Sequence, residues 1–131
     1  MCIFCQIVAG EISADIIYED EKTLAFLDNL PVHPGHILVI PKVHVINLED
    51  VSDTDLMAVS LTVKKMGALI KSRLGYEGYN VITNNDPVAN QVIPHLHFHL
   101  IPRIKNDNLN IWPQTPYQKD ELKEILEKLK A

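Results

Sequence analysis

The 131-residue chain lacks several features that would place it in a specialised class of proteins. It has no run of about 18 apolar residues, so we expect no transmembrane helix. Its first residues, MCIFCQIVAGE, have neither the basic segment nor the long apolar segment of a secretory signal peptide, so we expect a cytoplasmic protein. The formal net charge of −5 argues against broad electrostatic binding to nucleic acid or to an anionic membrane.

The sequence also lacks the common phosphate-binding fingerprints, because neither a P-loop nor a dinucleotide-binding glycine motif is present. Cysteine is scarce, with only Cys2 and Cys5, spaced C-x2-C. A structural disulfide is not expected in a reducing cytosol. A thioredoxin-like redox pair should follow a strand, which this stretch does not supply. Two interpretations are left: a metal site completed by ligands from elsewhere, or two small core residues.

The residues that are present predict one α+β domain over residues 1–131, since 47% hydrophobic residues are enough to build a core. Short apolar runs predict five strands, at residues 16–19, 23–27, 36–40, 79–83 and 94–102. Several of these runs follow one another through short connections, which favours antiparallel pairing. The prediction is therefore one antiparallel sheet with helices packed on it.

Three helices are expected. The longest spans residues 53–74, where apolar residues recur at spacings of three and four between Ser52, a helix-capping residue, and Gly75, a helix stop. Residues 3–9 predict a short helical turn that ends before Gly10. Residues 118–130 predict an amphipathic helix, and residues 104–117 an irregular C-terminal extension.

Half of the six histidines lie in one segment, PHLHFHLIP, at alternate positions 95, 97 and 99. Side chains alternate across a strand, so these imidazoles should share one face at a spacing of about 6.6 Å, with Pro94 and Pro102 at the strand ends. Such a spacing is long for three ligands of one metal ion, although long side chains can converge. A polar strand face without further meaning is the other simple interpretation.

Imidazole chemistry on a substrate fits this segment better. A neutral histidine can attack phosphorus when its far nitrogen is hydrogen bonded, because that bond fixes the tautomer. The phosphate oxygens then need donors or positive charge, which neighbouring histidines and the amides of Asn84 and Gln91 can supply.

The segment His95–Ile101 resembles the His-φ-His-φ-His-φ-φ signature (φ, apolar) of the histidine triad (HIT) family of nucleotide hydrolases and transferases. Further blocks resemble that family in order, at residues 2–7, 18–20, 24–28 and 34–44, so the likeness runs over about residues 2–103. With the ending Pro102-Arg103, the chain is similar to bacterial Hit proteins near the Hint branch. The resemblance implies a HIT-like fold, a purine nucleotide substrate and a homodimer.

The resemblance also implies roles for individual residues. His97 would be the nucleophile that forms a covalent nucleotidyl-histidine, His99 would contact the α-phosphate, and His36 would be a fourth active-site histidine. Asp28 would hold the ribose hydroxyls. The remaining implied nucleotide-binding residues are the purine-slot residues Phe4, Ile7, Ile12, Phe26 and Leu38 and the polar residues Asn84 and Gln91. In zinc-carrying relatives, a structural Zn²⁺ is held by the counterparts of Cys2, Cys5, His44 and His95.

The activity implied is cleavage at the α-phosphate of AMP derivatives, as in purine nucleoside phosphoramidases. Two positions depart from the Hint pattern: Val92 replaces a serine that helps to protonate the leaving amine, and Asn90 stands where glycine is usual. Val92 and the ending Pro102-Arg103 leave open a dinucleoside polyphosphate hydrolase of the Fhit-like branch. A nucleotide-binding regulator with residual catalysis and a zinc-stabilised interaction module are the alternatives outside enzymology.

Overall fold

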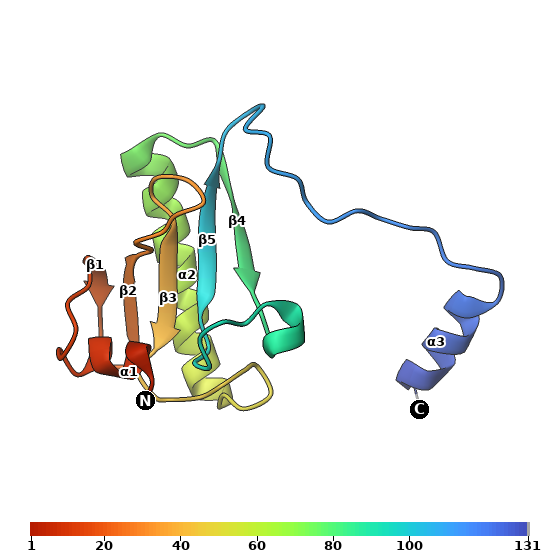
Figure 1. The fold of residues 1–131 in the computed structure, drawn as a ribbon, viewed down its shortest axis with the longest axis horizontal. Helices are drawn as coiled ribbons and strands as arrows, with labels where there is room; N and C mark the ends of the chain where they lie inside the picture. The colour runs from red at the N-terminus through yellow and green to blue at the C-terminus, as the bar shows by residue number, and fades with distance from the viewer. Residues whose placement is uncertain (131) are drawn as a thin grey trace.

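A five-stranded antiparallel sheet with the order β1-β2-β3-β5-β4 organises the chain in a computed structural model, which describes residues 1–130 (Figure 1). The elements in chain order are α1 (Ile3–Val8), β1 (Ile16–Glu19), β2 (Thr23–Leu27), β3 (Ile37–Pro41), α2 (Asp53–Leu74), β4 (Gly78–Thr83), the 3₁₀ turn η1 (Pro87–Ala89), β5 (Phe98–Arg103) and α3 (Glu121–Lys130). The predicted α+β class with one antiparallel sheet is confirmed. No helix within residues 1–130 is long and apolar enough to span a membrane.

Helix α2 begins and ends where its local signals place it. Ser52 Oγ accepts a hydrogen bond from the Asp55 amide at 3.1 Å, which satisfies one of the free N–H groups of the first turn. At the other end Gly75 adopts φ +75°, a left-handed conformation that glycine tolerates without strain. These caps explain why the predicted bounds of this helix agree with the observed ones.

The two faces of the sheet are covered differently. Helix α2 packs on one face through Val59, Met66 and Ile70, which are fully buried against side chains of β2, β3 and β5. On the opposite face α1 contributes Phe4 and Ile7 to a second cluster, completed by Leu24, Phe26, Leu38 and Ile40. The second face leaves room beside α1, and there the functional side chains gather.

The histidine segment is only partly a strand, which corrects the prediction for residues 94–102. Strand β5 begins at Phe98, so His95 and His97 precede it. The Pro41 carbonyl is 2.8 Å from His95 Nε2 and accepts from this imidazole, and the Leu96 amide donates to Val45 instead of to the sheet. Pro102 lies inside β5, at a position where β3 has ended and only β4 runs alongside.

Helix α3 also differs from expectation. It begins at Glu121, three residues later than predicted, and none of its residues is buried. It stands apart from the sheet at the end of a long connector (Figure 1). The prediction that every helix packs on the sheet is therefore wrong for α3.

Candidate active site and metal-binding cluster

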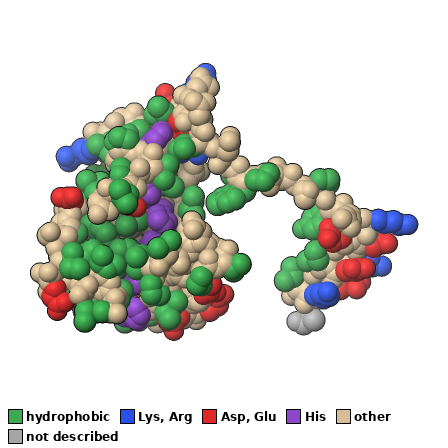
Figure 2. Space-filling model, viewed as in Figure 1, with side chains coloured by type: hydrophobic (Ala, Val, Ile, Leu, Met, Phe, Trp, Pro, Cys, Tyr) green, Lys and Arg blue, Asp and Glu red, His purple; other side chains and the backbone are tan. Residues whose placement is uncertain are grey.

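A cavity of about 590 Å³ opens beside α1, within the roughly 300–1,000 Å³ range of small-molecule sites. One part of its wall is apolar, and the other part is polar. Among the predicted nucleotide-binding residues the wall contains Phe4, Ile7, Ile12, Phe26, Leu38, Asp28, Asn84, His97 and His99. Figure 2 shows histidine side chains along the middle of this face, bordered by hydrophobic side chains. An apolar slot that leads to imidazoles suits a ligand with one flat apolar end and one anionic end.

His97 presents an unprotonated nitrogen at this cavity. Its Nδ1 lies 2.7 Å from the backbone oxygen of His95, and because a carbonyl can only accept, Nδ1 carries the proton. The Nε2 atom of the neutral ring therefore keeps its lone pair. The ring is only 6% exposed and packs edge-on against Phe4, with ring centroids 5.2 Å apart. Burial lowers the pKa of His97, which favours this neutral form, although the hydrogen bond to His95 and the charge of Asp28 oppose the shift.

His36 and His99 form a directed chain of hydrogen bonds. The Val32 amide donates to His36 Nδ1 at 3.1 Å, so the proton of a neutral His36 sits on Nε2. That Nε2 lies 3.0 Å from His99 Nδ1 and donates to it, which leaves the proton of His99 on its own Nε2. His36 does not line the cavity, whereas His99 does. The chain thus makes His99 a hydrogen-bond donor next to the lone pair of His97.

Both rings of this chain are held neutral. Burial, together with the neighbouring His97 and His36 and against the opposing charge of Asp28, lowers the pKa of His99 to about 4. Burial also lowers the pKa of His36, against the opposing charge of Asp28. The Asp28 carboxylate stands 3.7 Å from His36 Nε2 and accepts from the Leu30 amide at 2.9 Å. Asp28 still lines the cavity and can accept further hydrogen bonds there.

Gln91 was predicted to bind the nucleotide, but its side chain does not line the cavity. Its amide makes hydrogen bonds to the backbone of two loops instead. Its Oε1 accepts from the Asp86 amide at 2.8 Å, and its Nε2 donates to the Ile46 carbonyl at 2.7 Å. The side chain thus ties two loops together beneath the site. Its neighbours Asn90 and Val92 line the cavity instead, with Asn90 at φ +69°. The cavity wall also contains residues to which the sequence assigned no role: Ile3, Ser13, Ala14, Asp15, Leu27, Asn29, Leu30 and Ile93.

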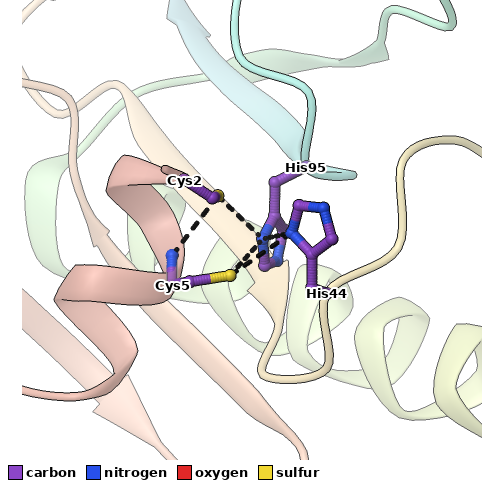
Figure 3. A group of neighbouring side chains, drawn as sticks. All are labelled: Cys2, Cys5, His44 and His95. Atoms are coloured by element: carbon purple, nitrogen blue, oxygen red, sulfur yellow. Dashed lines mark hydrogen bonds between the residues drawn. The ribbon is translucent and has the colours of Figure 1, made fainter.

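Cys2, Cys5, His44 and His95 converge at the edge of the same face. Figure 3 shows the two cysteines of the α1 region facing the two imidazoles. The Cys5 sulfur lies 3.3 Å from His44 Nδ1 and 3.6 Å from His95 Nδ1, the two Nδ1 atoms are 3.3 Å apart, and the Cys2 sulfur is 3.4 Å from His95 Nδ1. Because His95 Nε2 is committed to the Pro41 carbonyl, its Nδ1 offers a lone pair to the cluster.

This donor set fits a tetrahedral Zn²⁺. Bonds of about 2.0–2.1 Å to nitrogen and about 2.3 Å to sulfur separate tetrahedral ligand atoms by about 3.3–3.8 Å. The four contacts above run from 3.3 to 3.6 Å. The hydrogen bond from His95 Nε2 to the Pro41 carbonyl fixes the orientation of the imidazole, as such bonds do for histidines that bind metals. Burial and the adjacent Cys2 raise the pKa of Cys5, so its thiol stays protonated unless a cation displaces the proton.

Asp28, His36 and His99 also lie close enough to share an ion. This second group does not fit a metal, because the Val32 amide donates to His36 Nδ1 and so leaves the proton on Nε2. A protonated nitrogen has no lone pair to give. The group is a hydrogen-bonded chain, and of the two groups only the cysteine–histidine cluster has a donor set that fits a metal ion.

An α+β fold with an imidazole cluster at a nucleotide-sized cavity defines a class of small nucleotide-handling proteins. Residues 9–106 match the HIT domain family, and the chain belongs to that family. It is 40% identical over 136 residues to adenosine 5'-monophosphoramidase HNT1 of Candida albicans, with 98% of this chain and 89% of the relative covered.

Solved structures agree with the fold. A HIT family protein of Bacillus subtilis superposes with a TM-score of 0.90 at 36% identity and covers 98% of this chain and 94% of that one. A Zn-bound histidine triad family protein of Mycobacterium smegmatis gives a TM-score of 0.78 at 34% identity, covering 98% and 95%. The predicted family and the HIT-like fold are therefore confirmed.

Proposed function

We propose that this protein is a nucleotidyl hydrolase that cleaves at the α-phosphate of AMP derivatives through a covalent intermediate on His97. The observation that carries the proposal is the tautomer of His97, whose Nδ1–H is held by the His95 carbonyl at 2.7 Å while Nε2 is free at the cavity. A named phosphoramidase, 40% identical over nearly the whole chain, supports the substrate class.

The substrate lies along the cavity with its base in the apolar slot. Phe4, Phe26 and Leu38 form walls for a purine, and Asp28 accepts hydrogen bonds from the two ribose hydroxyls. This placement brings the α-phosphate to His97 and His99. Asn84 lines the same polar part, and we assign it to ribose or phosphate oxygens.

The chemistry then takes two steps. His97 Nε2 attacks the α-phosphorus, a P–N bond forms, and the bond from phosphorus to the leaving group breaks with its electron pair going to that group. His99 Nε2–H donates to a non-bridging phosphate oxygen and stabilises the charge in the transition state. Water next attacks the phosphorus and a P–O bond forms. The P–N bond breaks with its electron pair returning to His97 Nε2, AMP departs, and the proton that the water loses goes to solvent, which supplies the proton that a leaving amine takes up.

Quenched-flow mass spectrometry tests this mechanism directly. Protein mixed with an adenosine phosphoramidate and quenched in acid-free denaturant should carry one AMP on His97. The His97→Ala variant should show no adduct and at least a roughly 10³-fold lower turnover, while it still binds AMP. Turnover without an adduct, or an adduct on another residue, would contradict the covalent step.

Val92 favours a second candidate within the same chemistry. The side chain lines the cavity but has no proton to give to a leaving amine. Leaving groups that are stable as anions, such as the nucleotide of a dinucleoside polyphosphate, need no such proton. Diadenosine polyphosphate and adenosine phosphoramidate should therefore be compared on the native chain and on Val92→Ser. A gain by Val92→Ser that is confined to the phosphoramidate is the expected result, and equal gains on both would refute the role of Val92.

The Zn²⁺ that the cysteine–histidine cluster fits would be structural, because all four positions are filled by protein ligands. It would join the α1 region to the loop after β3 and to the segment before β5, next to the nucleophile. We expect about one zinc per chain in protein purified without chelator, and a loss of zinc in Cys5→Ser. The matched control is His33→Asn, which changes a histidine outside the cluster.

Three further expectations stay predictions. They are the homodimer, the cytoplasmic location, and the single domain with residues 104–131 as an extension. The unpaired outer edge of β4 in the described sheet supports the homodimer. Light scattering tests the first.

A further inference from the structure

Phe4 lies between the two cysteines of the metal-binding cluster in the sequence and also lines the nucleotide cavity. Its side chain is buried, with an exposed fraction of 6%. The ring packs edge-on against two imidazoles, with ring centroids 5.9 Å from His95 and 5.2 Å from His97. The first imidazole belongs to the cluster with Cys2 and Cys5, and the second belongs to the cavity. A single aromatic ring therefore contacts both sites.

The backbone makes a second connection between the two sites. His95 directs its Nδ1 to the cysteine sulfurs, while its carbonyl oxygen accepts from His97 Nδ1 at 2.7 Å. The same residue thus offers its ring to a metal ion and its backbone to the proposed nucleophile. The His95 side chain is fully buried, and close-packed interiors transmit displacements to neighbouring side chains.

Helix α1 has few contacts of its own that would hold Phe4 in place. The helix has only six residues, and isolated helices shorter than about 12–15 residues are marginal in water. Phe4 and Ile7 are its only buried residues. Bonds from a metal ion to the sulfurs of Cys2 and Cys5 would attach the turn that carries Phe4 on both sides of this ring. The metal ion would therefore decide how firmly Phe4 is held.

The cluster itself lies outside the cavity. None of its four residues, Cys2, Cys5, His44 and His95, lines the cavity in the described chain, and His44 is exposed. A change of these ligands therefore removes no contact with a nucleotide. An effect of the metal ion on nucleotide binding has to pass through the ring of Phe4 or through the His95 backbone.

We propose that zinc in this cluster is an effector of nucleotide binding and that Phe4 couples the two sites. The inference rests on the zinc site and the nucleotide cavity of the proposed function, but it does not need the covalent step. Zinc on the cysteines fixes Phe4 against His97 and the apolar slot, so a nucleotide has less conformational freedom to restrict when it binds.

The coupling acts in both directions. A nucleotide that fills the slot fixes the same ring and thereby holds the turn between Cys2 and Cys5 in the arrangement that binds zinc. Coupling free energies between two sites are reciprocal. Each ligand must therefore raise the affinity for the other by the same factor.

Two binding measurements on the full chain test this reciprocity. Calorimetric titration with AMP, on the zinc-loaded and on the zinc-free chain, gives the effect of zinc on AMP binding. Competition with a chromogenic chelator, with and without saturating AMP, gives the effect of AMP on zinc binding. We expect AMP to bind at least about fivefold more tightly to the zinc-loaded chain, and zinc to gain the same factor from AMP.

His44 gives the same test without removal of the metal ion by a chelator. His44→Asn changes one exposed ligand outside the cavity, and His33→Asn is the matched control at a histidine outside the cluster. At a zinc concentration that saturates the native chain, His44→Asn should bind AMP about as weakly as the zinc-free chain does. His33→Asn should bind AMP as the native chain does.

The role of Phe4 is tested against a second phenylalanine of the slot. Phe4→Leu and Phe26→Leu each remove one ring from the apolar wall, but of the two rings only that of Phe4 packs against His95. Both variants should weaken AMP binding. In Phe4→Leu the response of AMP affinity to zinc should fall below about twofold, whereas Phe26→Leu should keep the response of the native chain.

The outcomes separate this inference from the proposed function. A chain that binds AMP and zinc with independent affinities, or a Phe4→Leu variant that keeps the full coupling, would overturn the inference and leave the proposed hydrolase untouched. A chain that binds no zinc would overturn the metal site as well, and a chain that binds no AMP would overturn the proposed function. Methyl signals of Val59, in the core beneath α2, should be the same with and without zinc. A change there would trace weaker AMP binding to unfolding of the body and would refute coupling through Phe4.

Discussion

The proton positions of the histidines depend on which backbone group each ring meets. The His95 carbonyl holds the proton of His97 on Nδ1, while the Val32 amide forces the proton of His36 onto Nε2. One backbone acceptor and one backbone donor thus give opposite tautomers to two imidazoles that both pack against His99. That difference suits His97 to the proposed role of nucleophile and, through His36, suits His99 to the proposed role of hydrogen-bond donor.

At this scale His36 is a positioning residue that acts through His99. We expect His36→Ala to lower kcat by about 10- to 100-fold with little change in KM, because His99 then loses the partner that orients its proton toward the phosphate. Nitrogen chemical shifts of His99 should show its protonated Nε2 in the native chain and a mixture of tautomers in the variant. His36→Gln, whose amide can still donate, should recover part of the rate, and unchanged shifts in His36→Ala would rule out this role.

The buried histidines also predict how stability depends on pH. His99 and His36 lie beside each other, with His97 and Asp28 as the other titratable groups around them. In the folded protein the pKa values of both histidines lie below the ordinary value near 6.5, and that of His99 is about 4. The unfolded chain therefore binds more protons between those values, so stability is complete above about pH 6.5 and falls as the pH drops toward 4. The slope is at most about 1.4 kcal/mol per pH unit for each histidine. Urea unfolding between pH 7.5 and 5.5 should show this loss, and His99→Gln should flatten it.

Among the elements, α2 meets β4 at a position where only glycine fits. A Cβ on Gly67 would come within 2.2 Å of the Tyr79 hydroxyl and 2.3 Å of the carbon that bears it. Alanine is the better helix former by about 1 kcal/mol. Packing should nevertheless dominate, because Tyr79 is partly buried and packs against the core cluster beneath α2.

We accordingly expect Gly67→Ala to destabilise the protein by about 1–3 kcal/mol, measured by urea unfolding. Ser72→Ala on the exposed side of the same helix is the control and should change stability by less than about 0.5 kcal/mol. A stabilised Gly67→Ala would mean that Tyr79 moves aside easily.

For the whole molecule, the proposed zinc joins three segments that are far apart in the sequence. Removal of the ion with a strong chelator should lower the melting temperature by several degrees, because a metal bound only by the folded state stabilises that state. Cys2→Ser should reproduce the loss and should no longer respond to chelator. An identical melting curve with and without chelator would argue for two cysteines that only fill space.

Prediction from the sequence succeeded where the signals were local. The bounds of β1, β2 and α2 follow from apolar spacing and from the caps Ser52 and Gly75, and the structure agrees with them. It failed at His95 and His97, where period-two alternation was taken as a sign of sheet pairing. Histidine and apolar residues do alternate there. The Pro41 carbonyl, however, accepts a hydrogen bond from the His95 side chain, whereas in a paired strand it would accept one from a backbone amide. The prediction for Gln91 also failed on a distant partner. A side-chain amide can bind a ligand or hold two loops together, and the sequence does not show which of the two it does.

The sequence by itself determined the family, the α+β class and the set of candidate site residues, because these depend on residue type, spacing and short-range caps. The tertiary structure alone decided which nitrogen of each histidine carries the proton, that Gln91 holds loops and does not line the cavity, and that α3 is not buried. The physical reason is that these features depend on which contacts form in the folded chain, such as those of Val32 with His36 within a loop and of Ile46 with Gln91 from a distant segment. No local pattern in the sequence specifies a contact of that kind.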